Sequence, residues 1–175
     1  MRSEIVITLT GPDRVGIVEE VTGLLLGLNC NVESSRMARL GGEFAVLMLV
    51  TVPESREDDL ADAFRGLTEQ GYKVTYSPTV ATQGSVRADW EAFRIEVQGA
   101  DHEGIIHEIA QGLAQRGVNI ESMETSARPA PTSGTMLFTM IAEVVVPPGL
   151  ADTDWIDQLG EAGHEANVDI EVEAL

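Results

Sequence analysis

The sequence is poor in the residues that build disulfides and membrane spans. Cys30 is its only cysteine in 175 residues, and one cysteine cannot close a bridge within the chain, so we expect a reducing compartment, the cytoplasm. No stretch approaches the roughly 20 apolar residues of a membrane helix. The first residues carry no apolar segment of signal-peptide length. We therefore expect a protein that works without a membrane.

Basic charge is also scarce. Lysine and arginine number 11 against 29 aspartates and glutamates, which gives a net charge of −18, and Lys73 is the only lysine. A surface this acidic repels phosphate backbones, which argues against direct binding to nucleic acid. Hydrophobic residues make up 43% of the chain, an ordinary share for a globular protein with a core.

The chain contains an internal repeat. Residues 7–34 (ITLTGPDRVGIVEEVTGLLLGLNCNVES) align without gaps on residues 95–122 (IEVQGADHEGIIHEIAQGLAQRGVNIES). The identities include two glycines, two acids and an Asn-x-Glu-Ser run: Gly11 on Gly99, Asp13 on Asp101, Gly16 on Gly104, Glu20 on Glu108, and residues 31–34 on 119–122. Such a match in one frame indicates duplication. We expect a first module at residues 1–80, a linker at 81–91 that is polar and small, and a second module at 92–175.

Each copy shows the same order of hydrophobic patterns. In the first, short strands are predicted near residues 5–9, 32–39, 44–52 and 72–76, and helices with one apolar face near 17–28 and 60–67. Asp13 is a candidate N-cap for the first helix. The apolar run at 44–52 suggests a strand covered on both faces. In the second copy, the prolines and glycine of residues 128–134 predict an irregular loop.

The order βαββαβ, twice, predicts an α+β fold. Its modules are ferredoxin-like, with antiparallel four-stranded sheets and both helices on one face. Acylphosphatases share this order, but acids follow Val97-Gln98-Gly99 where their phosphate loop needs arginine. His102 and His107 are five residues apart and do not share a helix face, as zinc-protease histidines do. RNA-recognition modules also have this order, but they need aromatic residues on the middle strands and a basic sheet. Residues 43–47 (EFAVL) offer one aromatic residue and an acid instead. We therefore expect no catalytic residues, no metal and no cofactor.

The two copies resemble the ACT family. Its modules carry an Asn or Asp and then a Gly-apolar pair where strand one enters helix one, and an Asn-apolar pair at the start of strand two. The resemblance implies that the chain binds a small amino acid, such as glycine or serine, at module interfaces and regulates a protein partner. Two modules alone resemble the glycine cleavage repressor type. The ligand-binding residues it implies are Asp13, Arg14, Val15, Gly16, Ile17 and Asn31, with Asp101, His102, Gly104, Ile105 and Asn119.

These residue types suit an amino acid. The start of a helix offers unpaired backbone N–H groups to a carboxylate, and Gly16 or Gly104 leaves room for it. Asp13 or Asp101 can pair with the ammonium group, and the amide of Asn31 or Asn119 can donate and accept. Each also has a structural interpretation: the aspartate caps a helix, the glycine allows packing, and the asparagine forms a left-handed turn.

We therefore predict a non-catalytic, amino-acid-sensing regulatory protein that controls transcription or metabolism through a protein partner and forms a homo-oligomer, a dimer. Because the first copy keeps Gly-Pro-Asp-Arg at residues 11–14 and the second has Gly-Ala-Asp-His at residues 99–102, without the proline and with histidine for arginine, we expect the tighter site in the first. The alternative is an interaction module of the same type that binds no ligand.

Overall fold

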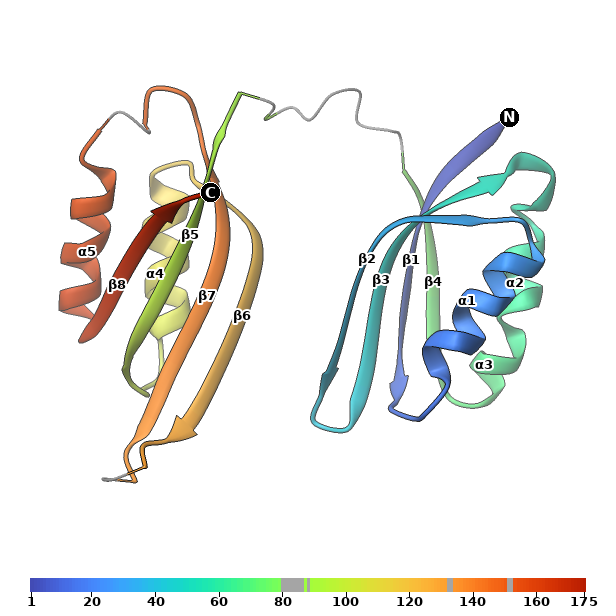
Figure 1. Cartoon of the computed structure of the whole chain (residues 1–175), viewed down its shortest axis with the longest axis horizontal. Coiled ribbons are helices and arrows are strands. Elements are labelled where there is room, and N and C mark those ends of the chain that lie inside the picture. The colour runs from blue at the N-terminus through green and yellow to red at the C-terminus, as the bar shows by residue number, and fades with distance from the viewer. Residues whose placement is uncertain (80–86, 88, 132–133, 151–152) are drawn as a thin grey trace. The chain divides into compact units, whose positions relative to one another are not determined.

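The computed structural model describes residues 1–79, 87, 89–131, 134–150 and 153–175. It divides into two compact units, Met1–Thr82 and Gln83–Leu175. Each unit is one module with its own sheet and its own helices (Figure 1). Of the expected linker at 81–91, residues 81–86 and 88 lie outside the described part, and the first strand of the second unit begins at Glu91.

The first module has its strands in the order β2-β3-β1-β4, all neighbours antiparallel. Its elements are β1 (Arg2–Pro12), α1 (Ile17–Gly27), β2 (Asn31–Leu40), β3 (Glu43–Pro53), a 3₁₀ turn η1 (Glu54–Arg56), α2 (Asp59–Ala63), α3 (Arg65–Glu69) and β4 (Lys73–Thr79).

The second module repeats the order as β6-β7-β5-β8. Its elements are β5 (Glu91–Ala100), α4 (Ile105–Gln115), β6 (Asn119–Pro129), β7 (Met136–Val146), α5 (Trp155–Glu165) and β8 (Val168–Ala174). In both modules the helices lie on one face of the sheet (Figure 1). The predicted α+β, tandem ferredoxin-like fold is confirmed.

The core of each module lies between its helices and the inner face of its sheet. Along β1 and β3 burial alternates, so that Ile7 and Val50, for example, are fully buried. This alternation corrects the expectation that residues 44–52 are covered on both faces. Leu47 keeps 47% of its surface exposed on the face without helices.

Two further expectations were wrong in detail. The second helix of the first module is divided at buried Phe64. Helical hydrogen bonds still cross the division, since the N–H of Phe64 donates to the carbonyl of Leu60 and the N–H of Thr68 donates to the carbonyl of Phe64. The apolar face therefore stays continuous. In the second module β6 extends through Pro129, so the irregular loop begins later than expected. An edge strand tolerates proline because one side of it has no partner strand.

Among the described helices, none is both long enough and apolar enough to cross a membrane.

Candidate functional site

The turn between β1 and α1, and its copy between β5 and α4, hold most of the predicted site residues. Gly16 and Gly104 are the N-cap residues of their helices, with φ angles of +87° and +101° and no side-chain capping bond. Asp13 is therefore not the N-cap, which corrects the sequence expectation. The positive φ explains the glycine at this position, since other residues enter this region at a cost.

Backbone hydrogen bonds hold both turns against the start of the neighbouring strand, the turn before β3 in the first module and the first residue of β7 in the second. The N–H of Asp13 donates to the carbonyl of Gly42 at 3.0 Å, and the N–H of Asp101 donates to the carbonyl of Met136 at 2.8 Å. The carboxylate of Asp13 also lies 3.7 Å from Nε of Arg39, in an exposed ion pair. Both acids thus occupy equivalent places, with side chains that have no capping role.

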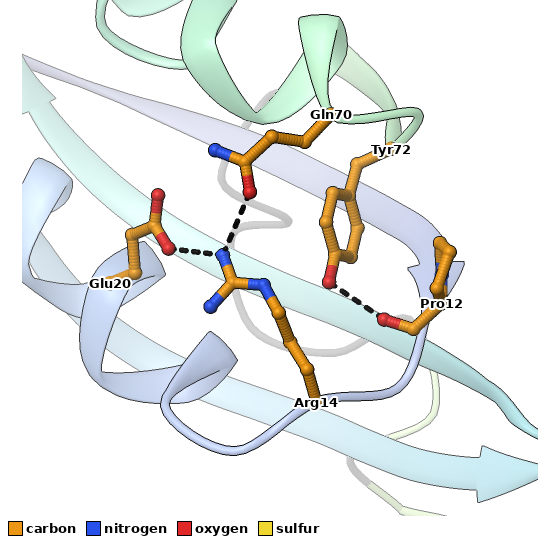
Figure 2. Close-up of polar contacts among 5 residues, drawn as sticks. All are labelled: Pro12, Arg14, Glu20, Gln70 and Tyr72. Carbon is orange, nitrogen blue, oxygen red and sulfur yellow. Dashed lines mark hydrogen bonds and ion pairs between the residues drawn. The ribbon is translucent and has the colours of Figure 1, made fainter.

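Arg14 ties the first turn to the far helix. Its guanidinium forms an ion pair with Glu20 of α1 and donates to Oε1 of Gln70, the residue after α3, at 3.2 Å (Figure 2). It also lies over the ring of Tyr72, 5.8 Å from the centroid. The bond to Glu20 is the main cause that raises the pKa of Arg14. Arg14 is thus committed to protein partners.

The neighbouring apolar residues divide into core and surface. Ile17 and Ile105 are 3% and 1% exposed and belong to the two cores, whereas Val15 is fully exposed. The side chains of these isoleucines anchor the helices in the cores. Ile17 and Ile105 could therefore contact a ligand only through their backbone, in the first helical turn. There the first N–H groups have no acceptor within the helix.

A hollow of about 450 Å³ lies at the turn of the second module. Four of the predicted residues line it, together with the outer side of α4 and one aromatic ring of β7: Asp101, His102, Gly104, Ile105, Ile106, His107, Ala110 and Phe138. Its size is within the range of small-molecule sites, about 300–1,000 Å³. It combines one carboxylate, the start of a helix and an apolar wall, the features that a small amino acid requires.

Asn31 and Asn119 serve a local structural purpose. The amide of Asn31 donates to the carboxylate of Glu33 at 2.9 Å, and the amide of Asn119 donates to Glu121 at 2.6 Å. In each case the acid lies at a break in the strand register, a bulge between residues 32 and 34 or between 120 and 122. The duplicated Asn-x-Glu run therefore fastens a β-bulge, which bends a strand and increases its twist at the edge of a sheet.

Asn31 is also far from the turn within its own module. The crossover through α1 brings the chain back, so that Asn31 pairs with Thr51, while the other end of β2 pairs with Glu43, next to Pro12. The nine residues from Glu43 to Thr51 span about 26 Å of strand. A single module therefore does not bring Asp13 and Asn31 together.

A second hollow, of about 390 Å³, lies elsewhere on the second module, between β5, β8 and α5. Its lining includes the carboxylates of Glu96, Asp169 and Glu171, with His164 the one basic side chain. These carboxylates repel the carboxylate of an amino acid. The hollow at the turn is therefore the better candidate site.

Sequence reasoning did not assign roles to Glu20, Gln70 or Phe138. The duplication of Glu20 as Glu108 in the repeat frame was a usable signal for the first of these. The other two are distant in sequence from the turn, so no local spacing indicated them.

Three comparisons bear on the family. A model of the ACT domain matches residues 3–76, the first module. A 47-residue segment is 47% identical to the glycine cleavage system transcriptional repressor of Escherichia coli K12, over 27% of this chain and 25% of that protein. The match thus spans about a quarter of the length of this relative.

Two crystal structures match over both modules. An unknown protein from Galdieria sulphuraria is 32% identical, with 100% of this chain and 99% of that chain covered and a TM-score of 0.82. A provisionally named glycine cleavage system transcriptional repressor is 24% identical, with 100% and 98% covered and a TM-score of 0.72, and shares the fold. The ACT module and the likeness to the repressor support a regulatory role. The first module, residues 3–76, thus matches the ACT domain, and the second module repeats its sheet order and its sequence pattern.

Proposed function

We propose that this chain is a non-catalytic sensor of a small amino acid, such as glycine or serine, that acts in the cytoplasm on a regulatory protein partner. The observation that carries the proposal is the hollow at the start of α4, where Asp101 and Gly104 lie beside the first turn of the helix. The carboxylate of the ligand would accept from the backbone N–H groups there, and Asp101 would hold the ammonium group.

The equivalent turn of the first module supports a second site. Asp13 has the same position as Asp101 relative to its helix, and its backbone is held in the same way. Asn31 and Asn119 can reach such a ligand only from a further module, because within one module they lie at the other end of the sheet. The predicted homo-oligomer would supply that module.

The repressor similarity supports transcription or metabolism as the process under control. With a net charge of −18, the chain is expected to act through a protein and not by contacting DNA. A gel shift of DNA by the purified chain at physiological salt would contradict that part of the proposal.

Calorimetry of the full chain with glycine, serine and the other common amino acids tests the sensing function. Asp13→Ala and Asp101→Ala, alone and together, remove the proposed ammonium partners without removing a helix cap. A charge-assisted hydrogen bond contributes about 1.5–3 kcal/mol, so each site should weaken by about tenfold or more. Asp157→Ala, an exposed aspartate of α5, is the control and should bind as the wild type does.

The outcomes separate the two functions that remain. Heat of binding that is lost only in the Asp13 and Asp101 variants supports the sensor. No heat with any common amino acid, in protein shown to be folded, leaves the interaction module without a ligand. Equal binding by the double variant would place the site elsewhere.

A further inference from the structure

His102 is held by backbone carbonyl groups on both sides of its ring. Its Nε2 lies 2.7 Å from the carbonyl oxygen of Ala166, and its Nδ1 lies 3.1 Å from the carbonyl oxygen of Glu103. Ala166 is the C-cap residue that follows α5, so the ring connects the β5–α4 turn to the end of the last helix.

The two contacts differ in what they require of the ring. A neutral imidazole carries one N–H and can donate to only one of the two carbonyls, and its other nitrogen then faces an oxygen lone pair. The imidazolium carries two N–H groups and satisfies both. The geometry therefore favours the protonated ring.

The charges around the ring act in the same direction. Asp101 belongs to the same turn and Glu108 to α4, and both raise the pKa of His102. The larger causes are the two backbone carbonyls, while desolvation lowers the pKa. The end of α5 contributes the carbonyl of Ala166, which lies at the negative end of the dipole of this helix.

The first module makes the same connection with a residue that does not titrate. In the repeat frame Arg14 corresponds to His102, and Gln70 is the C-cap after α3 as Ala166 is the C-cap after α5. The bond from Arg14 to Gln70 thus joins the equivalent turn and helix end. Arginine stays charged at every physiological pH, so this connection does not depend on pH.

We propose that His102 is a pH-sensitive latch between the β5–α4 turn and the end of α5, and that it makes the second module, but not the first, responsive to pH near neutrality. Protonation closes the latch with two hydrogen bonds. Loss of the proton releases one of them and frees the turn that lines the hollow of the second module.

The direction of the response follows from the raised pKa. The latch stabilises the second module fully below about pH 6.5, the ordinary pKa of histidine. This contribution is lost as the pH rises through the pKa of His102 in the folded protein. The proposal does not depend on the sensing function, because it concerns stability and titration in the absence of ligand.

The chain offers a selective reporter for this module. Its two tryptophans, Trp90 and Trp155, both lie in the second unit, and Trp155 is buried. Urea unfolding of the full chain, followed by tryptophan fluorescence at pH 6 and pH 8.5, therefore measures the second module. We expect a lower midpoint at pH 8.5 in the wild type, a smaller difference in His102→Gln, and a midpoint that stays high at both pH values in His102→Arg.

Two further measurements complete the test. His107→Gln removes an exposed histidine of α4 and should keep the pH dependence of the wild type. NMR titration should show His102 protonated on both nitrogens and titrating above about pH 6.5. An unchanged pH dependence in His102→Gln, or a His102 that titrates below that value, would overturn the proposal.

Discussion

The ring of Tyr72 lies directly on the backbone of Gly11. A Cβ built on Gly11 would stand 2.4 Å from Cδ1 of this ring, closer than any van der Waals contact allows. The ring is held there by its hydroxyl group, which donates to the carbonyl of Pro12 at 2.6 Å (Figure 2). The duplicated glycine before the turn is therefore a packing site, and in the second module a Cβ built on Gly99 would stand 2.7 Å from Cγ1 of Val168.

Gly11→Ala should destabilise the first module by about 1–3 kcal/mol, because the anchored ring cannot move away from the new methyl group. Gly23→Ala is the matched control. Gly23 lies within α1 with open space around it, so alanine there should stabilise the helix by up to about 1 kcal/mol. Urea denaturation followed by circular dichroism measures both, and a neutral Gly11→Ala would contradict the packing argument.

Tyr72→Phe should cost about 0.5–1.5 kcal/mol, since it removes one hydrogen bond and keeps the ring on Gly11. Tyr76→Phe is the comparison: its hydroxyl is 3.5 Å from the carbonyl of Leu60, at the limit of a hydrogen bond. We expect a clearly smaller loss there. Equal losses in thermal or urea unfolding would mean that the bond to Pro12 does not hold the ring.

Gly16→Ala should cost roughly 1 kcal/mol through its backbone alone, because φ is +87° and nothing lies within 4 Å of a Cβ placed there. Gly16→Asn should cost less, since asparagine enters the left-handed region more readily. Urea midpoints of the two variants give the comparison. If both variants are as stable as the wild type, the glycine is not required by the helix start.

Asn31→Ala should raise the pKa of Glu33. Hydrogen bonds from Asn31 and then from Thr51 hold the pKa of this carboxyl below its ordinary value. A carboxyl whose pKa is lowered by folding stabilises the fold at pH values above its ordinary pKa. This stabilisation is lost as the pH falls through the pKa of the carboxyl in the folded protein. NMR titration of the Glu33 carboxyl should therefore move to higher pH in Asn31→Ala, and also, by a smaller step, in Thr51→Val.

The same contact changes which variant best tests ligand binding. With Asp13 a candidate N-cap and Asn31 a turn residue, the sequence alone makes Asn31→Ala the less disruptive probe and Asp13→Ala one that removes a cap. In the structure Asn31 fastens the bulge of β2, while Asp13 caps nothing. A Glu33 pKa that does not respond to Asn31→Ala would restore the original preference.

The sequence by itself determined the two modules, their strand order and the glycine at each helix start. These features are written locally: hydrophobic periods of two and 3.6 residues identify strands and helices, and an ungapped repeat imposes one fold on both copies. The apolar period near residues 17–28 correctly placed the first helix, which is Ile17–Gly27, although the cap was assigned to Asp13 and not to Gly16.

Only the tertiary structure decided which of these residues meet. Arg14 reaches Gln70, and His102 reaches Ala166, across separations in sequence that no periodicity describes. Asn31 recurs with Asp13 in both copies, yet the parallel course of β1 and β2 places them at opposite ends of one sheet. The repeat shows which residues occur in both copies, whereas the path of the crossover helix determines their positions in space. Contacts between distant segments depend on that path.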